Sequence, residues 1–452
     1  MQRSAAFVPP QPPRSPTWLP AWQVLYGERL RSLLHGLAEP IFDVRHVPAR
    51  LLGIHVHIIN DPAMIGRVLL DNSANYIRPR LSQQLLRPML GNGLLTAEGE
   101  DWRVQRRLVA PTFSPAAVAG MTALMAEEAE CSAAALPAGP TRVDMAKVAT
   151  AATMAIISRA LFSGDARLRS ADAGRHIERL VLAAGEPRVL RLLGFEALDW
   201  SPRMIAVRAS RRYLRSRLTA IVDERGPEGG ADDFFGGLIR ALNEAMPADE
   251  ARQLAVDNAV TFYAAGHETT AVALAWSAYL LAAQPDLQEE LRAEALAALE
   301  GSPAEIAERV PRLRAFLEEA MRLYPPVVQI VREAAGDDDL GGVSVRTGEL
   351  VAIYPWVLHR HRALWDDPDT FDIDRFGPAR KAAIGRFQYL PFGAGPRICV
   401  GQRFATVEAL VILAHWLAAR RFRLTDGPPP MPTGRVTLRP KGGMPLLVEP
   451  LA

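Results

Sequence analysis

The sequence predicts a mainly α-helical protein with small β-sheets. Residues 248–284 contain no proline, and Pro247 and Pro285 bracket them, which is typical of one long helix. Apolar residues recur at helical spacing behind Cys399, and 121–136 and 143–162 are also expected to be helical. Strand patterns are short: 51–59 alternates in its middle, and 436–447 is expected to form a hairpin.

Composition excludes several classes of protein. The 452 residues include 52 basic and 50 acidic side chains, a net charge of +2, which argues against a nucleic-acid-binding protein. Cys131 and Cys399 are the two cysteines, too few for a disulfide framework or a cysteine-rich zinc site. Low cysteine usage fits a reducing, cytoplasmic compartment.

The N-terminus is rich in proline. Six of the residues 1–20 are proline, which predicts an extended, poorly packed leader. There is no secretory signal before it, and no run of about 20 apolar residues that would span a bilayer. The apolar segment 18–42 is expected to pack against the body of the protein, with contact to a membrane surface as the alternative.

The segment 51–59 is predicted to be a half-buried strand. Ile54, Val56 and Ile58 share one face, which would be the buried one. His55 and His57 share the other face. Because no third metal ligand lies nearby in the sequence, we expect these histidines to be solvated. A short helix is expected to follow at 62–70.

The long segment 248–284 would extend about 55 Å as a helix. Its apolar residues fall on nearly every face, which predicts burial. The stretch 264–270 breaks this pattern with Gly266, Glu268, Thr269 and Thr270, which are poor choices for a buried helix interior. Such a conflict often marks function. The structural alternative is a buried ion pair for Glu268 and a hydrogen bond from Thr269 back to its own helix.

A glycine-punctuated loop, 392–401, carries the second cysteine just before a helical pattern. Cys399 would lie near the N-terminal end of that helix, where free amide groups and the helix dipole favour a thiolate. Gly393, Gly395 and Gly401 would let a flat ligand approach the chain closely. A single thiolate ligand suits haem iron, because the porphyrin supplies the other four donors. The alternative is a small buried residue in a turn.

This loop resembles the cysteine-ligand loop of the cytochromes P-450, the haem-thiolate monooxygenases. The matching residues are Phe392, Gly395, Arg397, Cys399 and Gly401. The resemblance implies a mainly α fold with small peripheral β-sheets and one domain over 21–452. It also implies haem b between the long central helix and the helix that follows the Cys399 loop, with Cys399 as the axial thiolate.

The resemblance also assigns the unusual turn of the long helix. Gly266 would leave room for dioxygen over the iron, Thr269 would widen the helix and bind the oxygen species, and Glu268 would help to deliver protons. Because family members that use peroxide typically lose this acid–alcohol pair, its presence indicates dioxygen and electrons.

Four residues are expected to bind the haem propionates. Trp102 and Arg106 lie four apart, so on a helix they share a face and could clamp an anion; an ordinary aromatic–cation pair is the alternative. In the family this pair holds a propionate. Arg332 and Arg397 match further propionate positions, and several arginines are needed because uncompensated buried charge is costly.

Glu319 and Arg322 resemble the family's Glu-x-x-Arg helix, and Arg375 would complete that structural triad. The family often has proline where this chain has Ile373. Other residues, whose side chains would line a pocket for an apolar substrate such as a fatty acid, terpenoid, steroid or aromatic, are Leu94, Ala265, Val327, Val328, Ile330, Thr437 and Leu438. Residues 164–230 would form the roof of this pocket.

The family's chemistry implies partners that this chain does not contain. We expect a ferredoxin or a flavodoxin-type electron donor with its reductase, NAD(P)H used indirectly, and a monomeric, cytoplasmic enzyme. Arg103, Arg107 and Arg403 are a hypothetical docking face for an acidic donor. The alternative functions are a haem-thiolate isomerase or dehydratase, which would not need Glu268 and Thr269, and a non-catalytic haem sensor.

Overall fold

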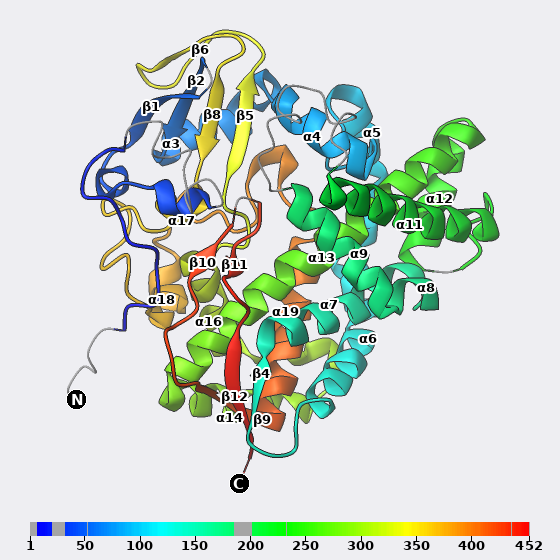
Figure 1. Ribbon diagram of the computed structural model, residues 1–452, viewed down its shortest axis with the longest axis vertical. Helices are drawn as coiled ribbons and strands as arrows, with labels where there is room; N and C mark the ends of the chain where they lie inside the picture. Colours follow the sequence, from blue (N-terminus) through cyan, green and yellow to red (C-terminus); the bar gives the residue numbers. More distant parts are fainter. Residues whose placement is uncertain are drawn as a thin grey trace.

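The computed structural model describes residues 7–19, 32–51, 53–184, 201–231, 233–434 and 436–451. Parts of the predicted leader (1–6 and 20), of the apolar segment 18–42 and of the predicted roof (185–200) therefore lie outside the described residues. A helical region fills the centre and right of Figure 1, and the largest sheet lies above and to the left. The prediction of a mainly α protein with small sheets is confirmed.

Eleven helices of the described residues have eleven or more residues: α4 Arg80–Leu90, α5 Gly99–Val109, α6 Pro115–Ala134, α7 Met145–Phe162, α9 Ala171–Ala184, α11 Pro202–Arg225, α12 Phe234–Ala245, α13 Ala248–Ala283, α14 Pro285–Leu299, α16 Pro311–Leu323 and α19 Gln402–Ala419. Shorter helices are α3 Pro62–Gly66, α8 Ala166–Arg169, α15 Ile306–Arg309, α17 Pro355–Leu358 and α18 Pro378–Lys381. The strands are β1 His46–Leu51, β2 Ile54–Ile59, β3 Tyr76–Ile77, β4 Thr141–Asp144, β5 Ile330–Ala334, β6 Asp338–Asp339, β7 Ser344–Val345, β8 Leu350–Ile353, β9 Arg420–Leu424, β10 Pro432–Thr433, β11 Arg439–Pro440 and β12 Pro445–Pro450.

The helix α13 is the centre of the fold. It has 36 residues and ends one residue before the predicted boundary, next to Pro285. Its neighbours include α7, α11, α12, α16 and α19, so it is covered on most sides and nearly all of its second half is buried. The helical pattern behind Cys399 is the helix α19, and the helices predicted at 121–136 and 143–162 correspond to α6 and α7.

By length and apolar composition, α7 could cross a bilayer, and the bent pair of α5 and α6 passes the same test. Two such segments are weak evidence for a membrane protein. More than half of α7 is buried, and its main neighbour is α13, as in the core helix of a globular protein.

The strand predicted at 51–59 is the second half of a hairpin, β1–β2, at the edge of a five-stranded sheet of order β1-β2-β8-β5-β3. The predicted faces were wrong. Ile54 is 44% exposed, whereas His57 and Ile59 are buried. His57 is buried because it has polar partners: its Nε2 lies 2.9 Å from Glu349 Oε2 and its Nδ1 lies 3.1 Å from His46 Nε2.

The predicted hairpin at 436–447 was also wrong. β11 pairs with β10, whereas β12 pairs with β4 and β9 in a separate three-stranded sheet. Gly442 and Gly443, both at positive φ, precede β12. They turn the chain away from β11, so that residues distant in sequence become its partners.

The described part of the proline-rich leader is packed, not loose as predicted. Phe7 O accepts a hydrogen bond from Phe371 N–H at 2.9 Å, and Pro10 O accepts one from the Tyr324 hydroxyl at 2.8 Å. Arg14 forms an ion pair with Asp369. Proline removes backbone donors but leaves carbonyl acceptors, and these carbonyls satisfy donors of the body.

Candidate active site

A cavity of about 570 Å³ lies between α13 and the Cys399 loop. Its walls are mainly apolar and come from α4, α9, α11, α13, α19 and the segment around β5. The apolar residues that line it include Leu86, Met89, Leu95, Leu180, Leu214, Ala264, Val327 and Ile330. A concave, mostly apolar space of this size is typical of a site for an organic ligand.

The cysteine loop is built so that the thiol faces this cavity. Gly395 has φ +72°, and a Cβ there would lie 1.7 Å from the Leu69 carbonyl oxygen, so only glycine fits. Cys399 N–H donates to Phe392 O at 3.0 Å, which closes the loop just before α19. Both Cys399 and Phe392 line the cavity. The thiol is exposed to this internal space although it lies deep in the molecule. Gly401 is the N-cap residue of α19 and has φ −87°.

The charge state of the thiol differs from the sequence-based expectation. Burial raises the pKa of Cys399, and this effect outweighs the Gly401 N–H and the Arg106 guanidinium, which lower it. The helix end alone therefore does not make a thiolate. A cation in the cavity would be needed to favour the charged form, as metal ions do for coordinating thiols.

The polar turn of α13 faces the cavity with Ala265 and Thr269, but not with Gly266. A Cβ on Gly266 would lie 2.6 Å from Ile157 Cδ1 of α7. Glycine therefore allows the close contact between the two helices, and the expectation that it leaves room in the cavity is corrected. Thr269 Oγ1 donates to Ala265 O at 3.1 Å, and α13 continues through this turn without a break, so the local widening stays a prediction.

Glu268 also lines the cavity, and it is held from the C-terminal segment. Its Oε1 accepts from Arg439 Nε at 2.5 Å and from Thr437 Oγ1 at 3.0 Å. The alternative weighed for this stretch, a buried ion pair for Glu268 and a back-bond for Thr269, is thus what the structure contains. Arg439 was not predicted, because nothing in the local sequence around it indicates a partner on α13.

Three arginines gather at one edge of the cavity: Arg78, Arg332 and Arg397. Burial, together with repulsion between these arginines, lowers the pKa of Arg78 to about 9 and that of Arg332 to about 10. Glu98 is the carboxylate that offsets them, with Oε2 at 2.5 Å from Arg397 Nη2 and Oε1 at 3.5 Å from Arg78 Nε. The cluster thus keeps an excess of two positive charges, which fits a ligand with two carboxylates such as haem.

Sequence reasoning missed Arg78 and Glu98, since neither belongs to a recognisable motif. The shared role of Trp102 and Arg106 at an anion stays a prediction; within the protein itself, the two side chains also have separate neighbours. Trp102 stacks against Arg397, with the guanidinium carbon 4.4 Å from the ring centre. Arg106 interacts with Cys399 through its charge.

Behind the loop, Glu319 and Arg322 form a fully buried, two-pronged ion pair at 2.7 and 2.8 Å. Arg375 Nε lies 3.5 Å from Glu319 Oε1, so the three residues come together. His359, which was not predicted, joins this triad to the Cys399 loop. Its Nδ1 lies 3.2 Å from Arg322 O, and its Nε2 accepts from Leu390 N–H at 2.8 Å.

The residues suggested for the substrate pocket divide into two groups. Ala265, Val327, Ile330 and Thr437 line the cavity. Leu94, Val328 and Leu438 are not among its lining residues; they are buried in the main core cluster. A backbone contact holds Leu438 in the core, because its carbonyl oxygen accepts a hydrogen bond from Trp276 Nε1 at 3.2 Å.

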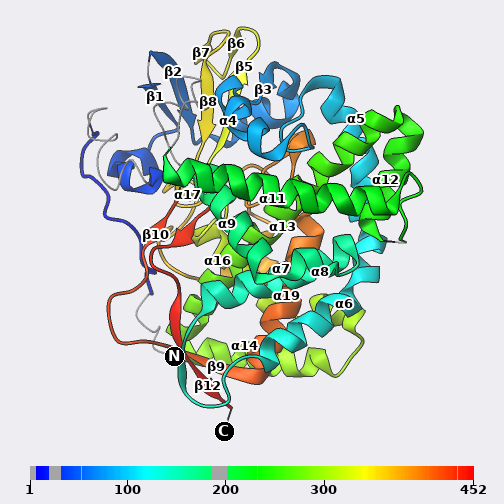
Figure 2. The same cartoon turned by 45° about the vertical axis from the view of Figure 1, so that its right-hand side comes forward.

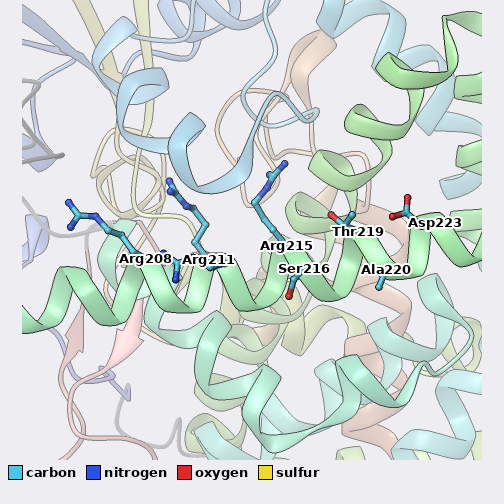
Figure 3. A pocket seen from close by; sticks show the side chains of 8 residues that line it. Arg208, Arg211, Arg215, Ser216, Thr219, Ala220 and Asp223 are labelled. Carbon is cyan, nitrogen blue, oxygen red and sulfur yellow. The ribbon is translucent and has the colours of Figure 1, made fainter.

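The roof of the cavity includes α11, which crosses in front of the molecule next to α9 and below α4 (Figure 2). Arginines on α11 extend towards α4, and a shallow pocket lies along this side of the helix (Figure 3). Arg211 donates to Pro88 O of α4 at 2.7 Å, and Arg215 forms a 2.8 Å ion pair with Asp257 of α13. These arginines fasten the roof to the elements on both sides.

A cytochrome P-450 family model matches residues 9–447 of this chain. The chain belongs to the cytochrome P-450 family. It is 32% identical over 407 residues to the cyclooctatin synthase of Streptomyces melanosporofaciens, covering 88% of this chain and 85% of that protein. The cyclooctat-9-en-7-ol 5-monooxygenase of the same organism is 33% identical over 400 residues, covering 84% of this chain and 83% of that protein.

Among solved structures, a six-coordinated cytochrome P-450 from Thermus thermophilus superposes with a TM-score of 0.69. It is 26% identical and is covered to 95%, with 90% of this chain matched. The chain is a P-450 monooxygenase of the haem-thiolate family, and relatives with the same fold occur in bacteria.

Proposed function

We propose that this P-450 holds haem b with the Cys399 sulfur as the axial ligand and oxidises an apolar organic molecule in the cavity below α11. One observation carries the proposal. The Cys399 thiol opens into a cavity that also borders the Ala265–Thr269 turn of α13 and the buried arginine cluster. When bound, haem supplies the activation of O2 that transfers one oxygen atom to the substrate.

The arginine cluster would hold the two propionates. Arg78, Arg332 and Arg397 line the cavity, and two further negative charges would neutralise them together with Glu98. Trp102 would keep Arg397 in place by stacking on its guanidinium. Trp102 and Arg106 would together also contact a propionate, and the Arg106 charge favours the deprotonated form of Cys399.

Glu268 and Thr269 would move protons from water to the cavity. The Thr269 hydroxyl donates its hydrogen bond to Ala265 O, so its oxygen can still accept a hydrogen bond from another group. The ion pair with Arg439 favours the charged form of Glu268, so opening this pair would make it easier for the carboxylate to accept a proton. We infer that the ion pair opens during turnover. Glu268→Gln should lower the coupling efficiency, which is the fraction of the consumed electrons used to form product, with little change in ligand binding.

The apolar walls favour a hydrophobic substrate. One relative is named a cyclooctatin synthase and another a cyclooctat-9-en-7-ol 5-monooxygenase, so cyclooctat-9-en-7-ol is a reasonable first ligand. An optical titration of the ferric protein against this alcohol, fatty acids, terpenoids, steroids and aromatics would identify ligands that displace iron-bound water. A substrate should shift the Soret band and then give a product with one added oxygen atom.

Electrons would come from a ferredoxin or flavodoxin-type donor and its NAD(P)H-dependent reductase, and we propose a monomer in the cytoplasm. Arg103, Arg107 and Arg403 remain the proposed docking face, although Arg103 is already 3.1 Å from Glu100 and Arg403 3.6 Å from Glu308. Donor affinity should fall as salt rises; an affinity that is equal in low and high salt would contradict this face.

The decisive test uses both cysteines. The reduced wild-type protein with carbon monoxide should show the red-displaced absorption of sulfur-ligated haem. Cys399→Ser should lose it, whereas Cys131→Ser, a change at an exposed position of α6, should keep it. A Cys399→Ser protein with the unchanged band would refute the axial ligand. NAD(P)H-dependent O2 consumption with surrogate redox proteins would then measure the activity.

A further inference from the structure

Glu98 joins segments that are far apart in the sequence. Its two oxygens contact Arg397 in the cysteine loop and Arg78 between β3 and α4, and Oε1 also accepts from the Arg78 backbone N–H at 3.3 Å. Arg332, on β5, interacts with the same carboxylate through its charge. All three arginines line the cavity.

The helix end beside Glu98 does not hold its side chain. Glu98 is the N-cap residue of α5, a position where the shorter side chains of Ser, Thr, Asp and Asn ordinarily accept hydrogen bonds from the first turn and contribute about 1 kcal/mol. The Glu98 side chain makes no such bond. The first turn has Glu100 and Asp101 near its positive end instead. The arginines, and not the helix, therefore determine where this side chain lies.

The charges in this cluster then balance. Three guanidinium groups and Glu98 leave an excess of two positive charges, and two haem propionates would cancel it. Without Glu98 the occupied cluster would keep one uncompensated positive charge at the edge of the haem. Because the surroundings are largely desolvated, such a charge acts more strongly there than in water.

We propose that Glu98 is the third anion of the haem anchor: it positions Arg78 and Arg397 and sets the charge beside the haem, and with it the midpoint potential of the iron. This rests on the proposed function, in which the propionates occupy the arginine cluster. Reduction adds one negative charge to the haem. A nearby cation therefore favours the reduced form, and a nearby anion opposes it.

A charge cycle in the holoenzyme tests the proposal by redox titration followed in the Soret band. Glu98→Gln should raise the midpoint potential and Arg78→Gln should lower it. Each shift is expected to correspond to about a tenfold change in the ferrous-to-ferric ratio at a fixed potential. The double variant loses one charge of each sign and should return close to the wild-type potential.

Glu100→Gln is the matched control. Glu100 lies in the first turn of α5, is 72% exposed and pairs with Arg103, so its loss should leave the potential unchanged. A merely structural role for Glu98 would not give shifts of opposite sign that cancel in the double variant. No shift in Glu98→Gln, or shifts of one sign in both single variants, would overturn the proposal.

Two outcomes need separate arms. If Glu98→Gln does not retain haem, Glu98→Asp and Arg78→Gln decide. The proposal is supported if Glu98→Asp, which keeps the charge, has an unchanged midpoint potential and Arg78→Gln has a lowered one. It is refuted if the potential of Arg78→Gln is not lowered. If wild-type protein lacks the red-displaced carbon monoxide band, the haem-thiolate assignment fails and the Glu98 proposal fails with it. A normal band with an unshifted Glu98→Gln refutes the role of Glu98 alone.

Discussion

At the scale of single residues, Glu268 and Gly266 on the central turn of α13 have neighbours that the local sequence does not reveal. Glu268 is paired with Arg439, and Arg439 keeps one buried nitrogen, Nη2, without a partner in the described residues. Gly266 lies against Ile157 of α7. In both cases a neighbour distant in sequence determines what the residue does, and each leads to a measurable consequence.

Arg439→Gln should destabilise the protein by about 1–3 kcal/mol, because it leaves Glu268 largely desolvated without its cation. The double variant with Glu268→Gln should lose less than the sum of the single variants. Urea unfolding would measure both. The control is Arg423→Gln: Arg423 is 58% exposed and pairs with Glu449 at 2.8 Å, so it should contribute less than about 1 kcal/mol. Equal losses at the two sites would contradict this difference in burial.

Gly266→Ala should destabilise by about 1–3 kcal/mol, since the added methyl group would overlap Ile157. Ile157→Val should recover part of the loss by removing the overlapping carbon. Gly120→Ala makes the same change in α6, where a Cβ meets nothing within 4 Å, and should stabilise by about 0.5–1 kcal/mol. Thermal unfolding of the holoproteins decides; a Gly266→Ala protein as stable as the wild type would mean that the helices can separate without penalty.

At the scale of elements, His359 connects α16 to the loop that carries Cys399. The ring is fully buried between Arg322 O and Leu390 N–H, and burial lowers its pKa to about 3. It is therefore neutral in the folded protein, with a donor on one nitrogen and an acceptor on the other. The His359 ring therefore links the buried Glu319–Arg322 pair to Leu390, just before the cysteine loop.

The sign of the resulting pH dependence follows from that pKa. An unfolded histidine binds a proton below about pH 6.5, whereas folded His359 does so only near 3. Its contribution to stability is present above pH 6.5 and is lost as pH falls from 6.5 towards 3, by up to about 1.4 kcal/mol per unit. His359→Gln should flatten this slope in urea unfolding at pH 7.5, 6 and 5.

The comparison with the wild type uses slopes and not absolute stabilities, because His359→Gln should also lower stability at every pH by weakening the link to Leu390. Parallel slopes for His359→Gln and the wild type would show that this histidine is not held neutral.

At the scale of the whole molecule, the leader and the C-terminal segment hold the helical core from outside. The described leader supplies backbone carbonyls to Phe371, Tyr324 and Glu39. The C-terminal segment supplies Arg439 and Thr437 to Glu268. Both ends of the chain therefore support the haem-side core and the central helix.

Deleting residues 1–16 should lower the free energy of unfolding by about 3–5 kcal/mol, because three donors lose their acceptors and the apolar contacts of Phe7 are lost. Tyr324→Phe removes only one of these bonds and should cost about 1 kcal/mol. Thermal unfolding compares the two. A deletion variant as stable as the full chain would show that the leader does not contribute to stability, as the prediction of a poorly packed leader implies.

The sequence alone determined the features that depend on local spacing. The proline-free run predicted α13, the glycine pattern identified the Cys399 loop, and the spacing of Glu319 and Arg322 indicated their pairing, because each signal lies within a few turns of one segment. The family motif then supplied the chemistry.

The tertiary structure decided which distant side chains meet. Arg397 and Glu98 are 299 residues apart, and Glu268 and Arg439 are 171 apart. Gly266 packs closely against Ile157, and the cysteine thiol is less acidic than its place beside a helix end suggested. Periodicity and spacing specify an element and its faces, but contacts, burial and charge balance arise only when separate elements pack together.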